Sequence, residues 1–183
     1  MAVPATLALR KAVATLRTIA QRVRSVPAEN LHLTLRFLGE VNEAVVPDIV
    51  EAMRHSVAAL PPHTVLCRGV GCFHRGRRGS VVWAGLEGTQ RLAATILALN
   101  RHLSAAGLAP GPKAWAPHVT LARCRGVEAE ALSTFLEAWS EQSFGPVPVE
   151  DVRLVRSKLH AAGALHEVVE RVVLAGKRTD RGG

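Results

Sequence analysis

The chain lacks several features that would place it in other classes of protein. No apolar run approaches the roughly 18 residues that a membrane-spanning helix requires, which excludes a helical membrane protein. Three cysteines (Cys67, Cys72 and Cys124) are an odd number and far too few for a disulfide-rich scaffold. They include no Cys-x-x-Cys pair, and no carboxylate cluster suits a metal ion. We therefore expect a protein that uses neither a metal nor a cofactor.

Acidic residues are also missing from the first 28 residues, which contain several Arg and Lys. A mitochondrial transit peptide has this composition. A helix of the domain is the better interpretation, because apolar residues follow helical spacing at Leu9, Val13, Leu16 and Val23. Arg10 and Lys11 interrupt the apolar stretch that a secretory signal needs, so we expect a cytoplasmic protein.

The bulk composition indicates a globular, basic protein. A length of 183 residues and a hydrophobic content of 48% suit one domain or two small lobes with a real core. The formal net charge is +8 and the isoelectric point is about 10.6. Such a charge favours an anionic partner, nucleic acid before a membrane surface, but says nothing about the fold.

Two short runs share one pattern: His32-Leu33-Thr34-Leu35 and His118-Val119-Thr120-Leu121. Successive side chains of a β-strand point to opposite faces, so each run turns its His and Thr to one face and its apolar residues to the other. One such run alone is more often a surface or core feature. Two runs in the same phase predict a pocket with two titratable imidazoles and two hydroxyl groups, which suits a phosphoester.

Periodicity and helix-breaking residues predict alternating helices and strands. We expect helices from Pro4–Thr6 to about Arg24 and at about 43–60, 89–106 and 127–140. We expect strands at about 31–38, 64–71, 80–86, 115–123, 147–157 and 165–174. Residues 176–183 have too little apolar surface to fold and are expected to be disordered.

The order helix, His-containing strand, helix, strand occurs twice, which indicates an internal duplication. The predicted fold class is α+β, with two pseudo-symmetric lobes, each an antiparallel-rich sheet covered by helices, and a central groove. Each lobe would present one His-x-Thr run, which would bring His32 and His118 together. We expect a single bilobal domain over residues 1–175 and a monomer.

The residues around both runs resemble a known family. Residues 27–40, which include Phe37-Leu38-Gly39, are similar to the first signature of the bacterial and archaeal RNA 2′,3′-cyclic phosphodiesterases. These were formerly called 2′-5′ RNA ligases and belong to the two-histidine phosphoesterase superfamily. Residues 117–123 are similar to the second signature, and residues 81–86 and 157–159 also resemble the family. The similarity covers about residues 5–174.

This resemblance implies metal-independent hydrolysis of an RNA 2′,3′-cyclic phosphate end to a 2′-phosphate, with 2′-5′ ligation as a minor activity. Histidine suits both proton transfers, because its ordinary pKa of about 6.5 lies near working pH. The family assigns His32 as the proton donor to the leaving 3′-oxygen and His118 as the proton acceptor that activates water. The sequence alone leaves open which His does which. Thr34 and Thr120 would hydrogen-bond the phosphate oxygens.

Arginines supply further candidates for phosphate binding. Arg36 shares the phase of the first His and Thr, so it lines the groove or stands on its rim. Arg123 has the phase of the apolar residues in a regular strand and would point away, unless a bulge or strand end redirects it. Arg75, Arg77 and Arg78 form a basic loop that suits RNA phosphates or simply stays solvated.

Two departures from the family pattern stand out. Relatives usually begin with a short hydrophobic strand before the first helix, and this chain starts almost at that helix. Either the start is truncated or mis-assigned, or the first lobe lacks this N-terminal strand. His166 lies near a point where relatives often carry Tyr. Phe37 is expected in the core, and the histidines without a matching Thr are interpreted as structural or surface residues: His55, His63, His74, His102, His160 and His166.

Other functions stay open at this stage. The substrate would then be another cyclic phosphate, such as ADP-ribose cyclic phosphate, or a 2′-5′-linked oligonucleotide. A basic RNA-binding module without turnover is an alternative from a different class. A zinc site built on the two His is disfavoured, because no third and fourth ligands stand at a recognisable spacing.

Overall fold

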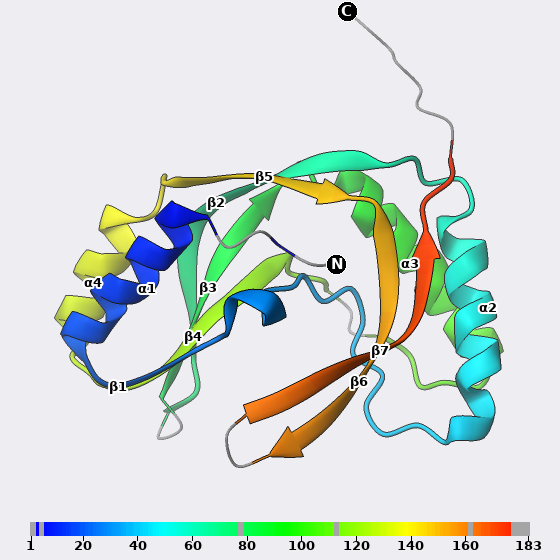
Figure 1. Cartoon of the computed structure of the whole chain (residues 1–183), viewed down its shortest axis with the longest axis horizontal. Coiled ribbons are helices and arrows are strands. Elements are labelled where there is room, and N and C mark those ends of the chain that lie inside the picture. The colour runs from blue at the N-terminus through cyan, green and yellow to red at the C-terminus, as the bar shows by residue number, and fades with distance from the viewer. Residues whose placement is uncertain (1–2, 4–5, 77–78, 112–113, 161–162, 177–183) are drawn as a thin grey trace, which may run out of the picture.

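Five strands form the main sheet, and each pairs with its neighbours in antiparallel fashion. They span Ala20–Ser25 (β1), His63–His74 (β2), Ser80–Glu87 (β3), His118–Val127 (β4) and Ser143–Val149 (β5). Their order across the sheet is β1-β4-β3-β2-β5 (Figure 1). Asp151–His160 (β6) and Gly163–Val173 (β7) form a separate two-stranded sheet. This computed structural model describes residue 3 and residues 6–76, 79–111, 114–160 and 163–176.

Helices pack against these sheets in two groups. In the described residues the α-helices are Leu7–Ile19 (α1), Val46–Val57 (α2), Gln90–Ala105 (α3) and Ala129–Ala138 (α4), with 3₁₀ turns at Ala28–Asn30 (η1) and Glu43–Val45 (η2). α1 and α4 lie side by side at one end of the main sheet, whereas α2 packs against α3 and beside β6 and β7 (Figure 1). The predicted two-lobed α+β fold is therefore confirmed.

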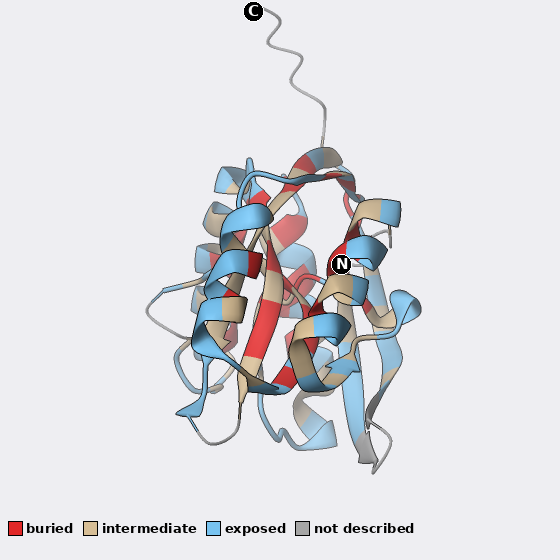
Figure 2. Cartoon of the chain, turned by 90° about the vertical axis from the view of Figure 1, so that its left-hand side faces the viewer, coloured by how far each residue is buried: buried red, intermediate tan, exposed pale blue. Residues whose placement is uncertain are grey.

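Burial follows this layering. Figure 2 shows buried residues along the strands and on the inward faces of the helices. The two lobes do not follow chain order, because β1 and β2 lie in the same sheet as β4 and β5. The sheet therefore joins segments from both repeats of the pattern seen in the sequence.

The first helix is shorter than predicted. It begins after Thr6, whose hydroxyl oxygen accepts a hydrogen bond from the Leu9 backbone N–H at 3.3 Å. It ends at Ile19 instead of continuing to Arg24, because residues 20–25 form β1 on the edge of β4. The backbone hydrogen bonds offered by β4 outweigh the weak helix preference of residues such as Val23.

The first His-x-Thr run is extended but does not form the predicted regular strand over 31–38. Leu33 makes an isolated antiparallel bridge to Val119, and the segment leaves the sheet soon afterwards. Phe37, predicted to be in the core, is 80% exposed for this reason. Among the described residues no strand precedes α1, and the Val3 backbone N–H donates to the Leu31 carbonyl oxygen.

The predicted strand over 147–157 is two strands in different sheets. β5 is an edge strand, and an edge tolerates Pro146 and Pro148, which lack the N–H group that an inner strand must donate. The chain then passes at Glu150 from the main sheet into β6 of the second sheet. Near the other end, the Gly176 N–H donates to the Leu60 carbonyl oxygen. Residues 177–183 of the predicted tail lie outside the described residues.

The cysteines behave as the small apolar residues expected from the sequence. Cys67 and Cys124 are buried, Cys72 is half-buried, and all three are free thiols. Burial raises the pKa of Cys67 to about 11, so its thiol stays protonated at neutral pH. Of the helices described, none has the length and apolar character needed to span a membrane.

Asp151 is a buried charge at the start of β6, 6% exposed. Its carboxylate accepts hydrogen bonds from Nε of Arg153 at 2.8 Å and from Nε of Arg171 at 2.7 Å. The two arginines stand directly opposite each other in the β6–β7 ladder, where like charges repel. Burial alone would raise the pKa of Asp151, but the bonds and charges of the arginines outweigh burial and lower it below 3.8.

We predict that Asp151→Asn lowers the free energy of unfolding by about 1–3 kcal/mol at neutral pH, because it leaves two opposed arginines without their anion. A carboxyl group with a lowered pKa stabilises the fold above its unfolded pKa and loses that effect as pH falls through the folded value. The difference between the two proteins should therefore shrink below pH 3.8. Urea unfolding at several pH values measures it. Glu150→Gln, at an exposed neighbour, is the control, and equal losses in both variants would contradict the assignment.

Candidate active site

One backbone pairing sets the two His-x-Thr runs side by side. Leu33, at the centre of the first run, forms an antiparallel bridge to Val119, at the centre of the second. Both side chains point into the core, with exposed fractions of 2% and 0%. Because side chains alternate between faces, the His and Thr on either side of each point away from the core. The pairing thus turns all four toward one surface.

The antiparallel register also decides which side chains are neighbours. It places His32 across from Thr120, and Thr34 across from His118. The two histidines are then diagonal neighbours, with Cα atoms about 7–8 Å apart by ordinary sheet geometry. Their electrostatic coupling agrees with this proximity, because the charge of His118 contributes to lowering the pKa of His32. The four side chains selected from the sequence are brought together.

Both imidazoles are held in the same way. Nδ1 of His32 lies 2.6 Å from the Asn30 carbonyl oxygen, and Nδ1 of His118 lies 2.8 Å from the Ala116 carbonyl oxygen. A carbonyl oxygen only accepts, so each Nδ1 carries the hydrogen and donates it. Nε2 of each ring is left to bind or release a proton. The two rings are therefore fixed in the tautomer that proton transfer through Nε2 requires.

A third histidine adjoins the site from the second sheet. The His166 ring, on β7, packs edge-on against His32 with centroids 5.3 Å apart. Its Nδ1 is hydrogen-bonded to the Ser157 hydroxyl on β6 at 2.9 Å. The first His-x-Thr run thus spans both sheets, because Leu33 pairs with the main sheet while His32 contacts the β6–β7 hairpin.

Aromatic side chains surround His118 on the main sheet. The Phe73 ring lies edge-on to His118 with centroids 5.0 Å apart, and Trp83 lies 6.1 Å away. Phe73 and Trp83 also contact each other, at 5.3 Å. Gly71 makes room for the Trp83 ring, because a Cβ at this position would overlap it. These contacts restrict the His118 ring on the side away from the first run.

The electrostatic environment lowers the pKa of His32. Burial is the largest cause, because it disfavours the charged imidazolium. The hydrogen bond to the Asn30 carbonyl opposes this effect by stabilising the imidazolium. The charges of His166 and His118 lower the pKa further. Protonated His32 is thus a stronger acid than an ordinary histidine.

Arg36 is directed into a neighbouring loop, although it shares the phase of the first motif. Its Nη2 donates to the Ala109 carbonyl oxygen at 2.6 Å, and its Nε is buried without a hydrogen-bond partner in the described structure. Gly111 leaves space for the guanidinium, which a Cβ would overlap. From the same part of the chain, Trp115 Nε1 donates to the Thr34 carbonyl oxygen at 3.0 Å. Arg36 and Trp115 thus fix the two motif segments relative to each other.

Arg123 is redirected by a β-bulge. The register between β3 and β4 shifts after Thr120, so that Leu121 and Ala122 both point into the core. Arg123 is therefore exposed on the face that carries His118 and Thr120, not on the face that a regular strand would give it. Arg75 is exposed in the β2–β3 loop, and Arg77 and Arg78 lie outside the described residues.

The remaining histidines whose side chains are described lie elsewhere. His55 on α2 pairs with Glu51 at 2.9 Å and stacks on His102 of α3. His63 makes the same type of Nδ1 contact as the two motif histidines, but its Nε2 is buried without a partner in the described structure. His74 lies near Ser80 at the end of the β2–β3 hairpin, and the side chain of His160 is not described. A backbone contact at Nδ1 is therefore not by itself a sign of catalysis.

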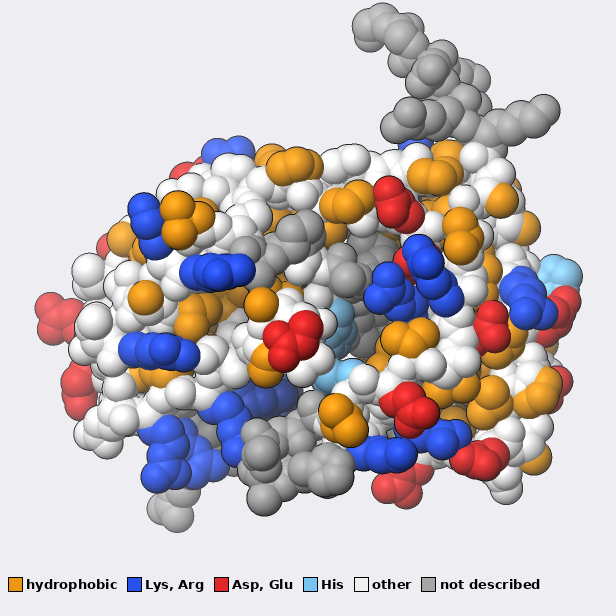
Figure 3. Space-filling model, in the orientation of Figure 1, with side chains coloured by type: hydrophobic (Ala, Val, Ile, Leu, Met, Phe, Trp, Pro, Cys, Tyr) orange, Lys and Arg blue, Asp and Glu red, His pale blue; other side chains and the backbone are white. Residues whose placement is uncertain are grey.

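The site opens to solvent between the lobes. Figure 3 shows histidine side chains within a hollow near the middle of the face, with Lys and Arg around it. Among the described residues, no three His, Cys, Asp or Glu side chains group in a way that could hold a metal ion. The described side chains offer imidazoles for proton transfer and hydroxyl and guanidinium groups for binding an anion.

Sequence reasoning missed two parts of this site. His166 was interpreted as structural or surface, yet its ring contacts His32; its position in the family pattern, where relatives often carry Tyr, was the available signal. Phe73 lies beyond the strand expected over 64–71, but β2 extends to His74 and turns Phe73 toward His118. A regular alternation from the buried Val65 and Cys67 would turn Phe73 toward the core, and the extra residue between Arg68 and Val70 reverses its face.

Comparisons with known proteins identify a family and several relatives of this chain. Residues 4–161 match the family model of the 2′-5′ RNA ligase superfamily. An RNA 2′,3′-cyclic phosphodiesterase from Aeropyrum pernix is 34% identical over 155 residues, which cover 84% of this chain and 87% of the relative. One from Thermus thermophilus is 37% identical over 161 residues, covering 84% and 77%. A crystal structure of a Thermus thermophilus protein has a TM-score of 0.76 at 28% identity and covers 93% of this chain and 92% of its own.

We predict that His32 titrates below its ordinary pKa of 6.5 and that His166→Phe raises this pKa. The phenyl ring keeps the edge contact but removes a positive charge. The increase should be partial, because burial remains the larger cause. NMR titration of the imidazole Cε1 protons measures both values. His55→Phe, on α2, should leave the titration of His32 unchanged, and an equal shift in both variants would contradict the proposed contact.

Proposed function

Because the chain belongs to the 2′-5′ RNA ligase superfamily, we propose that it is an enzyme that hydrolyses RNA 2′,3′-cyclic phosphate ends. One observation carries the proposal: the Leu33–Val119 pairing turns two His and two Thr side chains to one face. The activity named for relatives at 34% and 37% identity supports it.

In the proposed mechanism His118 takes a proton from the attacking water through Nε2, and His32 donates a proton to the departing 3′-oxygen. The product is a 2′-phosphate. Each well-placed acid or base accelerates such a reaction by roughly 10²–10⁴-fold, which corresponds to about 3–5 kcal/mol of barrier. The lowered pKa of His32 suits the donor role, because it makes the imidazolium a better acid.

We assign the binding of the phosphate to two hydroxyl groups and one arginine. Thr34 and Thr120 stand across from the two histidines, so their hydroxyls can donate to the non-bridging oxygens. Arg123 lies on the same face because of the bulge in β4, and we include it among the phosphate contacts. Arg36 instead holds the 109–111 loop, so we assign it a role in the architecture of the site.

The same groups support a related reaction, in which the 5′-hydroxyl of a second RNA attacks the cyclic phosphate in place of water. The hydroxyl gives its proton to His118, the 3′-oxygen leaves with a proton from His32, and a 2′-5′ linkage results. We propose this 2′-5′ ligation as a minor activity, because water is far more abundant than an RNA hydroxyl end. A monomer that acts in the cytoplasm remains a prediction from the sequence.

Incubation with a 2′,3′-cyclic nucleotide in EDTA should yield the 2′-monophosphate, identified by chromatography against both isomers. His32→Ala and His118→Ala should each lower kcat/KM by about 10²–10⁴-fold, since each removes one proton-transfer group. His55→Ala is the control, because His55 is exposed on α2. An RNA-binding module without turnover would instead leave the nucleotide intact and keep its RNA affinity in the double variant.

The dependence of kcat/KM on pH should be bell-shaped, because one histidine must be neutral and the other protonated. The alkaline limb should follow His32, so activity falls as pH rises through a pKa below 6.5. His166→Phe should move this limb to higher pH by raising the pKa of His32. Initial rates from about pH 5 to 9 measure both limbs. If His166→Phe shifts the acidic limb instead, the roles of the two histidines are the reverse of those proposed. A flat pH profile would rule out acid–base catalysis by the two histidines.

A further inference from the structure

Four arginines form a stripe on the open face of the β1–β4 ladder. Arg22 stands directly opposite Arg125, and Arg24 directly opposite Arg123. All four are exposed, whereas Val23 and Cys124 between them face the core side. Figure 3 shows Lys and Arg side chains gathered over this end of the molecule. We call these four residues the arginine stripe.

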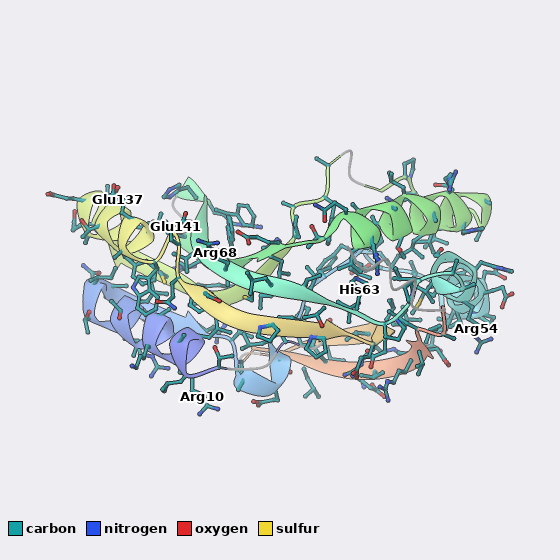
Figure 4. All side chains as sticks on the ribbon, turned by 90° about the horizontal axis from the view of Figure 1, so that it is seen from above. Arg10, Arg54, His63, Arg68, Glu137 and Glu141 are labelled. Atoms are coloured by element: carbon teal, nitrogen blue, oxygen red, sulfur yellow. The ribbon has the colours of Figure 1, made fainter. Side chains whose placement is uncertain are left out.

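This arrangement is electrostatically unfavourable without a bound anion. Like charges directly opposite each other on neighbouring strands repel. Among the described residues, Arg22, Arg123 and Arg125 form no ion pair with a carboxylate. Other arginines do form such pairs, for example Arg68 with Glu141 at 2.6 Å, which lie close together in Figure 4. The stripe thus concentrates positive charge, and the described carboxylates leave three of its members unneutralised.

The stripe is continuous with the active site. The bulge at Leu121 and Ala122 puts Arg123 and Arg125 on the same face of β4 as His118 and Thr120. From His118 to Arg125 this strand covers roughly 20 Å, at about 3.3 Å per residue. That length exceeds a single nucleotide and can accommodate several. A regular strand would have turned both arginines into the core.

We propose that the arginine stripe binds the phosphodiester backbone of the RNA that leads to the reacting end, so that an RNA chain is a better substrate than a mononucleotide. This inference rests on the proposed function and adds the surface that binds the rest of the RNA chain. Guanidinium groups recognise phosphate oxygens in paired hydrogen bonds, and binding through phosphates is independent of base sequence. The RNA phosphates supply anions to the opposed arginines.

The test compares Arg22→Gln/Arg125→Gln with a control that removes the same charge, Lys11→Gln/Arg91→Gln, at exposed positions on α1 and α3. The substrates are a 2′,3′-cyclic mononucleotide and an RNA of about 12 nucleotides with a cyclic phosphate end. The stripe variant should lose about 5–30-fold in kcat/KM on the RNA, through KM, because two surface phosphate contacts are removed. Its kcat/KM on the mononucleotide should change by less than about twofold, since that substrate does not reach the two arginines.

Binding is measured separately with a labelled 3′-phosphorylated RNA of the same length, by fluorescence anisotropy at about 50 to 300 mM KCl. The slope of log affinity against log salt should be smaller by roughly 1.4 in the stripe variant, because each lost contact to single-stranded RNA contributes about 0.7. This measurement needs no turnover. Wild-type protein that hydrolyses neither substrate would therefore overturn the proposed function and leave the stripe still testable.

Thermal melting at low salt separates an RNA-binding role from a structural one. The stripe variant should melt at the same temperature as the wild type or higher, because it removes one opposed pair of charges. A lower melting temperature, an RNA affinity equal to that of the control variant, or equal losses on both substrates would each overturn the proposal.

Discussion

The site depends on one pairing between two segments that are far apart in the sequence. Leu33 and Val119 are both buried, so neither can move to the surface without exposing apolar area to water. A slip of one residue would reverse the faces of one run and send its His and Thr into the core. The core therefore fixes the relative position of groups that lie outside it, exposed or half-buried, and the hydrogen bonds from Arg36 and Trp115 add to that constraint.

How much of this structure can be predicted from the sequence depends on how far apart along the chain the interacting residues lie. The alternation of Leu31, Leu33 and Leu35 with His32 and Thr34 is local, and the structure keeps those faces. The end of α1 at Ile19 was not predictable in this way, because β1 exists only where the edge of β4 offers it hydrogen bonds. The same holds for the β5–β6 division, since the two strands join different sheets.

Long-range geometry also determines the parts of the site that local patterns did not reveal. The phase of Arg123 depends on a bulge whose position is set by the pairing of β3 with β4. His166 reaches His32 because the β6–β7 hairpin folds back across the first motif, a contact between residues of different sheets. Both cases concern positively charged or titratable groups brought close together. In the proposed function a bound phosphate compensates for that accumulation of positive charge, so substrate binding would also relieve the repulsion within the site.

The matching backbone contacts of His32 and His118 have a consequence for successive reaction cycles. Hydrolysis in the proposed direction ends with the proton moved from one ring to the other, so the protein does not return by itself to its starting state. Both rings make the same Nδ1 contact to a backbone carbonyl oxygen, so each can carry or lack the Nε2 proton without losing that contact. Solvent must reset the proton positions, and the exposed part of the His32 side chain provides the route for a new proton, although the ring is partly buried. Until that reset occurs, the proton positions in the proposed mechanism suit the closing of a cyclic phosphate, with His32 as the base and His118 as the acid, instead of its opening.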